Sequence, residues 1–244
     1  MKLLAWNLNH RASRRRIPTW IAEAIAVHAP DLVVLTEYVV GPDHGRFVEQ
    51  LATARLDHTL TSTSTPRQNL VLVASRTRIF AGGILAPPLH PSVPPNFLHV
   101  EMADSGLQVL GFRMPAFVSK DRLFKLQTWD WLRSTMASLE KLPTLVVGDF
   151  NTAPGDPVGR GGDSFGLLVD AGWDHALPES GYSWRHARSG TERRIDHLFT
   201  SGALRCEAAR YDWDWRARSE EAASGKVGIP DHAMLIAEVG PAHR

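Results

Sequence analysis

Cysteine is almost absent from this 244-residue sequence, which contains only Cys206. One thiol can form neither an intrachain disulfide nor a cysteine-based metal cluster, so both are excluded, as suits a reducing compartment. Long apolar runs are missing too: none approaches the roughly 18 residues of a membrane span, and the apolar start of the chain is too short for a signal peptide. We therefore expect a soluble, cytoplasmic protein with no membrane span.

An excess of either charge is also lacking, because 27 basic residues face 26 acidic ones and leave a formal net charge of +1. Such a chain has no overall attraction for nucleic acid or membranes, so an anionic substrate must be bound by a local basic patch. Arginine greatly outnumbers lysine, and its paired donors suit phosphate binding. A bias this general can equally reflect codon composition, so it carries little weight.

The composition is that of an ordinary globular protein, with 43% hydrophobic and 22% charged residues. The length fits one large domain or two small ones. No internal repeat, low-complexity segment or linker divides the sequence. We therefore expect a single domain over residues 1–244.

Short apolar runs alternate with segments of helical periodicity along the chain. The clearest helix is expected at 121–140, where apolar residues step by three or four along one face. Prolines predict a loop or interrupted edge at 84–97, and the polar segment 214–229 is expected to be a mobile loop. Many strands with helices between them predict a layered α/β sandwich. Further helices are predicted at 17–30, 43–56 and 163–171, and strands at 3–8, 31–37, 69–75, 107–113, 145–148, 182–185, 194–200, 204–211 and 233–239.

Acidic and amide side chains follow the apolar runs at their carboxyl ends. Asn7, Glu37, Asp149 and Asn151 all lie at such positions. Strand ends at the rim of a rigid sheet can assemble a site from distant parts of the chain. Two later elements add Asp196 and the pair Asp231-His232. The set is mostly oxygen donors, without thiolates or an HExxH helix, and it therefore suits Mg²⁺ or Mn²⁺ better than zinc.

Simpler explanations exist for these residues one by one. A Gly-Asp pair such as Gly148-Asp149 is common in the turn after a strand, and Asn7 could merely satisfy nearby backbone groups. Asp196 could be an ion-pair partner of Arg193 or Arg194. The functional interpretation therefore depends on the set as a whole.

Taken together, five motifs resemble the endonuclease/exonuclease/phosphatase superfamily, which includes DNase I and exonuclease III. They occur in the expected order and cover residues 3–239: Trp6-Asn7-Leu8-Asn9, Thr36-Glu37, Gly148-Asp149-Phe150-Asn151, Arg194-Ile195-Asp196-His197 and Asp231-His232. Any one of them would be weak evidence, but five in register are specific. The resemblance implies a four-layered α/β sandwich in which two packed mixed β-sheets are flanked by helices.

The resemblance also implies a divalent metal, Mg²⁺ or Mn²⁺, bound mainly by the carboxylate of Glu37. Asn7 would lie beside it, and Asp231 would lie in or near the metal shell. The ligand set is compatible with one metal or with two.

Catalytic roles are implied for four further residues. Asp149 would orient or deprotonate the attacking water, and Asn151 would donate a hydrogen bond to the scissile phosphate. His232 would stabilise charge developing on phosphorus or handle a proton, with Asp196 fixing its tautomer and orientation. Such chemistry relies on positioning and charge neutralisation.

Two positions depart from the family pattern. Arg113 stands where the family usually has Tyr or His; it could hold a phosphate oxygen but cannot serve as an acid or base, because it stays charged. Pro230 replaces the usual Ser before the terminal Asp-His, and we expect a modest effect.

Substrate contacts are expected near the same rim. A basic stretch after the first strand would grip flanking phosphates, although a solvated loop explains it equally well. Trp184 and Trp215 belong to late segments near Asp196 and Asp231, where they could stack on a base or sugar. Arginines that could contribute are Arg11, Arg14, Arg15, Arg16, Arg185 and Arg194.

The stretch Tyr182-Ser183-Trp184-Arg185, followed by Arg194-Ile195-Asp196, resembles exonuclease III-like nucleases more than lipid phosphatases. The sequence therefore predicts a metal-dependent endonuclease or exonuclease whose substrate is DNA or, second to it, RNA. One alternative is a phosphatase or phosphodiesterase for a small-molecule or lipid-linked phosphoester, for which a closed pocket is expected. A non-catalytic binding module is disfavoured, because the metal and water-positioning residues are all present.

Overall fold

The computed structural model describes residues 1–9, 17–62, 68–87, 96–116, 122–186, 188–218 and 230–242. Within these ranges the strands form two large sheets and one short hairpin, β10 (Trp184–Arg185) with β11 (Glu192–Arg193). The first sheet has the order β13 (Leu204–Asp212), β14 (Met234–Pro241), β1 (Lys2–Asn7), β2 (Leu32–Tyr38), β4 (Leu70–Ser75), β3 (His58–Thr61). The second has the order β5 (Ile79–Ala81), β6 (Phe97–Met102), β7 (Gln108–Arg113), β8 (Thr144–Asp149), β12 (Asp196–Thr200), β9 (Asp174–His175).

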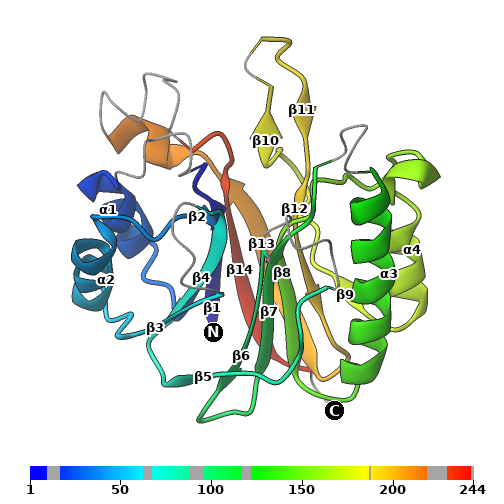
Figure 1. Cartoon of the computed structure of the whole chain (residues 1–244), viewed down its shortest axis with the longest axis horizontal. Helices are drawn as coiled ribbons and strands as arrows, with labels where there is room; N and C mark the ends of the chain where they lie inside the picture. The colour runs from blue at the N-terminus through cyan, green and yellow to red at the C-terminus, as the bar shows by residue number, and fades with distance from the viewer. Residues whose placement is uncertain are drawn as a thin grey trace.

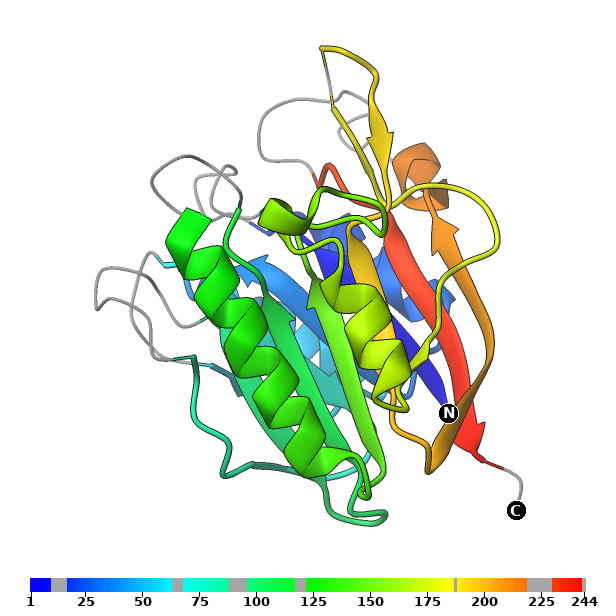
Figure 2. The same cartoon turned by 90° about the vertical axis from the view of Figure 1, so that its right-hand side faces the viewer.

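The two sheets lie face to face, and helices cover both outer faces (Figures 1 and 2). Helices α1 (Thr19–Val27) and α2 (His44–Thr53) cover the first sheet, and α3 (Arg122–Leu139) and α4 (Ser164–Asp170) cover the second. Three apolar clusters correspond to the three contacts between layers. The predicted α/β sandwich of two mixed sheets flanked by helices is confirmed. No helix in the described ranges has the length and apolar character needed to cross a membrane.

Alternation along the strands explains these layers. In β1, Leu3 and Ala5 belong to the cluster between the sheets, whereas Leu4 and Trp6 belong to the cluster beneath α1 and α2. Successive side chains of a strand point to opposite faces, and here both faces are covered. The central strands are therefore apolar throughout, which is why the sequence shows them as uninterrupted runs.

Most predicted elements are present. The helices expected at 43–56, 121–140 and 163–171 are α2, α3 and α4, and the helix expected at 17–30 is α1. Strands β3, β5, β6, β9 and β11 were not predicted. Strand β3 is partly polar, β5, β9 and β11 have only two or three residues, and the six-residue β6 directly follows the proline-containing segment 84–97. The prediction of a loop from residue 214 is wrong at its start, because Asp214–Arg218 forms the 3-10 helix η3 with Trp215 buried. Residues 219–229 lie outside the described ranges.

Gly148 determines the backbone conformation of β8 just before Asp149, which is the last residue of this strand. It pairs with Phe112 of the parallel strand β7, and its φ is 147°. A Cβ at this position would lie 1.9 Å from the backbone oxygen of Phe112. Only glycine accommodates both the backbone conformation and this close approach.

We predict that Gly148→Ala destabilises the fold by more than about 2 kcal/mol, because the backbone of β7 or β8 must move to accept the methyl group. The matched control is Gly45→Ala in α2, where a Cβ meets nothing within 4 Å. That change should be neutral or stabilising by up to about 1 kcal/mol, since alanine favours helix. Urea unfolding of both variants measures the difference, and equal stabilities would contradict the steric argument.

The buried His197 and the half-buried His175 form a hydrogen-bonded pair beneath α4. His197 Nε2 lies 3.0 Å from the carbonyl oxygen of Thr152, so this nitrogen carries the hydrogen. His197 Nδ1 must then accept, and it does so from His175 Nε2 at 3.1 Å. Burial lowers the pKa of His175 to about 4 and that of His197 to about 3. Both rings are therefore neutral in the folded protein under mildly acidic conditions.

Because these pKa values lie below the unfolded value near 6.5, the unfolded chain gains protons first as the pH falls. Their contribution to stability is complete above pH 6.5 and is lost on acidification. His175→Gln keeps a side-chain donor for His197 but removes one of the two histidines whose pKa is lowered by folding. We predict that it loses less stability between pH 7 and pH 5 than the wild type does, by on the order of 1 kcal/mol. Urea midpoints at the two pH values test this, and equal losses would refute it.

Candidate active site

Strand ends from both sheets bring the predicted residues together. Asn7 and Glu37 lie at the ends of the parallel strands β1 and β2, and Asp149 ends β8. Asp196 begins β12 and is the direct cross-strand partner of Asp149. His232 joins them through an isolated bridge to Trp184 at the base of the β10–β11 hairpin. This hairpin projects from the same end of the sandwich (Figure 1).

The backbone is strained at this end. Asn9, Glu37 and Asn151 have φ values of 47°, 51° and 47°, in the left-handed region that non-glycine residues seldom adopt. In the described ranges only two other non-glycine residues share this feature, Ala29 and Arg55. Strain of this kind persists where surrounding contacts hold it and is concentrated at functional sites.

Asp149 is the most enclosed carboxylate of the site, with 1% of its surface exposed. Its Oδ1 accepts from the backbone N of Asn151 at 2.8 Å, and its Oδ2 accepts from the side-chain amides of Asn151 and Asn7, each at 3.0 Å. Burial, opposed by His232 and Arg113 and reinforced by Asp196 and Glu37, raises the pKa of Asp149 to about 6. The carboxylate is thus fixed by three donors and has the basicity to accept a proton near neutral pH.

Both asparagines are fully used as donors. The Nδ2 of Asn7 contacts Glu37 Oε1 at 3.2 Å as well as Asp149, and the Nδ2 of Asn151 contacts the carbonyl oxygen of Met114 at 2.9 Å as well as Asp149. Asn7 Oδ1 accepts from the backbone N of Asn9 at 2.9 Å. In this arrangement Asn7 and Asn151 position carboxylates, and neither amide has a hydrogen to spare for a phosphate oxygen.

His232 and Asp196 form a buried pair. His232 Nδ1 lies 2.7 Å from Asp196 Oδ2, and the backbone carbonyl of His232 accepts from Trp6 Nε1 at 3.0 Å. Burial alone would lower the pKa of His232, but the carboxylate of Asp196, together with Asp149, raises it to about 10. The ring is therefore charged at neutral pH, with Nδ1 held by Asp196 and Nε2 left to act as a donor.

Arg113 lies among the same carboxylates. Its Nε is 2.7 Å from Glu37 Oε1 and 3.6 Å from Asp149 Oδ2. The Nε–H direction is not aligned with an acceptor, so the contact is a charge interaction without a well-directed hydrogen bond. Burial would lower the pKa of Arg113, but Glu37 and Asp149 outweigh it and raise the value.

Of the predicted site residues described above, all except Asn7 and Asp196 line one cavity of about 220 Å³. Asp231, with 48% of its side chain exposed, lies at its rim, and Trp184 Nε1 donates to Asp231 Oδ2 at 3.2 Å. The cavity thus unites carboxylates, an imidazolium and a guanidinium in one place. Its lining in the described ranges comprises Asn9, Glu37, Arg113, Asp149, Asn151, Trp184, Arg193, Ile195, Asp231 and His232.

The predicted metal ligands are Glu37, Asn7 and Asp231. Glu37 and Asp231 line the same cavity and offer carboxylate oxygens, which hard cations prefer, while Asn7 donates its side-chain amide to Glu37. The buried cluster of Asp149, Asp196 and His232 has ligand atoms within 4.8 Å of one another and could also hold a metal. An ion in that cluster would have to displace a proton from His232, because imidazole binds metals in its neutral form.

The predicted substrate contacts divide into three groups. Trp184 lines the cavity. Arg185 is exposed and faces Glu192 across the hairpin at 3.9 Å, while Arg194 donates to the carbonyls of Pro178, Glu179 and Gly181, away from the cavity. The basic residues Arg11, Arg14, Arg15 and Arg16 lie outside the described ranges.

Trp215 requires a correction. It was expected to stack on a base or sugar, but only 1% of it is exposed. Its ring lies 5.7 Å from that of Trp20, stacked at 7°, and 5.4 Å from that of Trp6. Trp215 lies in a polar segment near the end of the chain, and this context suggested an accessible side chain. In the structure, η3 directs Trp215 into the core beside α1.

Sequence reasoning missed two residues close to the site. Arg193 lines the cavity and forms an ion pair with Asp156. Lys125 is fully buried on α3 and donates from Nζ to the carbonyl oxygen of Asn151 at 2.6 Å; burial lowers its pKa to about 8. The sequence signal that could have identified Lys125 was its spacing. It lies one helical turn before the core residue Trp129 and therefore on the same, buried face of α3.

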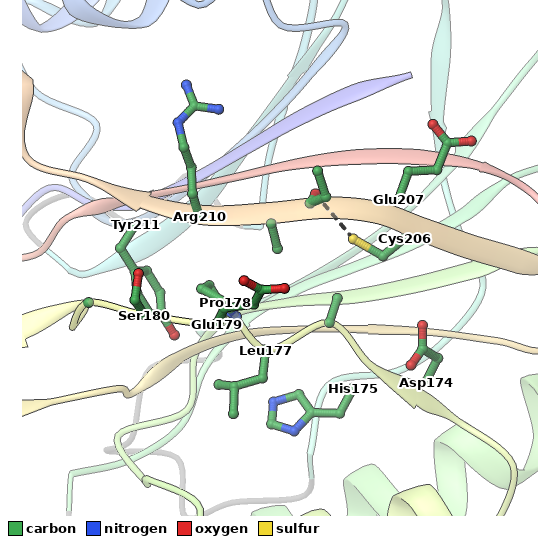
Figure 3. Close-up of a pocket in the computed structure, with 14 residues that line it drawn as sticks. Asp174, His175, Leu177, Pro178, Glu179, Ser180, Cys206, Glu207, Arg210 and Tyr211 are labelled. Atoms are coloured by element: carbon green, nitrogen blue, oxygen red, sulfur yellow. Dashed lines mark hydrogen bonds between the residues drawn. The ribbon is translucent and has the colours of Figure 1, made fainter.

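A larger hollow of about 580 Å³ lies elsewhere, between the segment 174–181 and β13 (Figure 3). The thiol of Cys206 donates to the backbone oxygen of Ala208 at 3.3 Å (Figure 3). Burial raises the pKa of Cys206 to about 11, so the thiol stays protonated and is a poor nucleophile at neutral pH. The hollow shares no residue with the cavity around Asp149.

Comparisons with known proteins agree with this geometry. A model of the Endonuclease/Exonuclease/phosphatase family matches residues 4–224. No curated protein matches the sequence. Similar solved structures include an AP endonuclease from Archaeoglobus fulgidus, with 19% identity, a TM-score of 0.74 and 98% of both chains covered.

Two further structures differ in the activities that they name. A 3′ phosphatase from Neisseria, bound to a product DNA hairpin, has 23% identity and a TM-score of 0.73, with 98% of this chain and 99% of that chain covered. A mannosyl-6-phosphatase from Bacteroides thetaiotaomicron has 16% identity and a TM-score of 0.64, with the same coverage. At these identities the likeness establishes the fold and leaves the substrate open.

Proposed function

The chain belongs to the endonuclease/exonuclease/phosphatase family, whose members hydrolyse phosphoester bonds, and we propose that it is a metal-dependent nuclease that cleaves phosphodiester bonds in DNA. The observation that carries this proposal is the convergence of Glu37, Asp149 and His232 on one cavity. A fixed carboxylate that can direct water, beside a charged imidazole that can stabilise charge on a phosphate, suits attack by water on a phosphoester.

Water attack would be directed by Asp149. Its two oxygens are held by Asn7 and Asn151, so the carboxylate cannot turn away from a bound nucleophile. The predicted donation from Asn151 to the scissile phosphate would need one of its present hydrogen bonds to be exchanged. We therefore assign Asn151, like Asn7, to positioning Asp149.

Charge on the phosphate would be met by His232, whose Nε2–H is available because Asp196 holds Nδ1. Glu37 and Asp231 would hold a Mg²⁺ or Mn²⁺ ion, which supplies further charge neutralisation and lowers the pKa of bound water. Lys125 supports the arrangement from beneath, since its ammonium group fixes the carbonyl of Asn151.

DNA is favoured over a small substrate by the β10–β11 hairpin. It brings Trp184 to the cavity and carries the exposed Arg185 as the next residue, which suits stacking on a base and contact with a phosphate farther along a strand of DNA. Two of the similar structures are named as DNA-processing enzymes. A phosphatase for a small phosphoester is the second candidate, because the cavity is only about 220 Å³ and the net charge is near zero.

We predict that Asp149→Asn and His232→Gln each lower kcat by on the order of 10²–10⁴, since each removes a proton-transfer or charge-stabilising group at nearly constant volume. Asp104→Asn, on an exposed turn, is the matched control and should keep full activity. Thermal unfolding should confirm that the three variants stay folded. Near-normal turnover in either site variant would exclude its assigned role.

A substrate panel decides between the two candidate functions. Supercoiled plasmid, abasic duplex, single-stranded DNA and RNA are compared with soluble phosphomonoesters in Mg²⁺ and in Mn²⁺. We expect cleavage of DNA that a chelator abolishes. Orthophosphate release from a monoester without nucleic-acid cleavage would establish the second candidate, and activity that survives the chelator would overturn the metal mechanism.

A further inference from the structure

Arg113 is anchored at the centre of the site by its backbone. It is the last residue of β7, pairs with Asp149 of β8, and donates its backbone N–H to the carbonyl oxygen of Asn96 at 2.8 Å. Its side chain is 20% exposed, against 14% for Glu37 and 1% for Asp149. Arg113 is thus fixed through its backbone, and one fifth of its side chain is exposed.

Carboxylates are the most numerous charged groups at this site. Glu37, Asp149 and Asp231 line the cavity, and Asp196 pairs with His232. Arg113 is the cation that contacts two of these carboxylates, whereas Arg193 is paired with Asp156. Removal of Arg113 would therefore leave Glu37 and Asp149 without their nearby guanidinium.

A metal ion bound to Glu37 would compete with Arg113 for the same carboxylate. The Nε of Arg113 lies 2.7 Å from Glu37 Oε1 and 3.6 Å from Asp149 Oδ2, and a cation on Glu37 would need an oxygen at about 2.0–2.6 Å. Two positive groups this close repel each other strongly in a partly buried site. The Nε–H of Arg113 is not aligned with an acceptor, so this donor is not committed to Glu37.

We propose that Arg113 is a displaceable counter-ion, which neutralises Glu37 and Asp149 until a divalent metal binds and then turns toward the cavity mouth to hold a phosphate oxygen of the substrate. The inference rests on the proposed metal-dependent function and adds a residue that couples metal binding to substrate binding. A planar guanidinium is well suited to the second task, since its paired donors match two phosphate oxygens. Metal and phosphate therefore bind with positive cooperativity through this side chain.

The first test measures Mn²⁺ binding alone by calorimetry, without substrate. Arg113→Gln removes the charge, and its Kd for Mn²⁺ should be about tenfold or more lower than that of the wild type, because no cation has to be displaced. Arg113→Lys keeps the charge and should bind nearly as the wild type does. Arg205→Gln, an exposed change of equal charge on β13, should alter the Kd less than twofold.

Arg113→Tyr provides a second uncharged side chain should the glutamine variant fail to fold, and it must shift the Kd in the same direction. An unchanged or higher Kd for Mn²⁺ in the uncharged variants would overturn the proposed counter-ion role of Arg113. It would leave the proposed metal-dependent function unaffected. Absence of Mn²⁺ binding in every variant up to millimolar concentrations would overturn the proposed function itself.

The second test measures inorganic phosphate binding with and without Mg²⁺. In the wild type, Mg²⁺ should strengthen phosphate binding by more than it does in Arg113→Gln, because only the wild type releases a guanidinium. An equal increase in phosphate affinity on adding Mg²⁺ to the two proteins would overturn the proposal that Arg113 turns from Glu37 to bind phosphate.

Discussion

Burial of negative charge is the constraint on which this end of the sandwich depends. Asp149 and Asp196 are 1% and 3% exposed, and an ionised carboxylate so enclosed is stable only when hydrogen bonds or opposite charges replace water. Asn7 and Asn151 hold Asp149, and His232 holds Asp196. These partners come from strands of both sheets, so the charges are compensated only when the sheets are packed together. Site and fold therefore form as one.

The same packing makes the site rigid. Gly148 lets β8 approach β7 so closely that no side chain fits between them, and Glu37 and Asn151 keep left-handed backbone conformations at the ends of their strands. Groups held in this way need little reorganisation when charge develops on a substrate, which is how electrostatic stabilisation lowers a barrier. Arg113 is the exception. Its backbone is fixed, whereas its long side chain can exchange one anionic partner for another.

Much of the fold and of the candidate site could be predicted from the sequence, because the local residue pattern of these segments matches their role in the tertiary structure. Apolar runs ending in Asn7, Glu37 and Asp149 identified buried strands and the polar residues at their ends, and the periodicity of 121–140 identified α3. Prediction failed where the local sequence carries no periodicity or other sign of structure. The two-residue strand β9 has no periodicity to detect, and Trp215 in a polar segment gives no sign that η3 turns it against Trp6 and Trp20. Lys125 looked like a polar residue on an amphipathic helix.

The sequence by itself determined the layered α/β class, the family and the chemical type of the site, because these follow from the kind and order of residues along the strands. Only the tertiary structure decided which donor serves which acceptor. Asn7 and Asn151 are both committed to Asp149, Lys125 is buried beneath Asn151, and Arg113 contacts Glu37. Such pairings depend on distances of about 3 Å between residues up to 142 positions apart, and those distances are set by the packing of the two sheets.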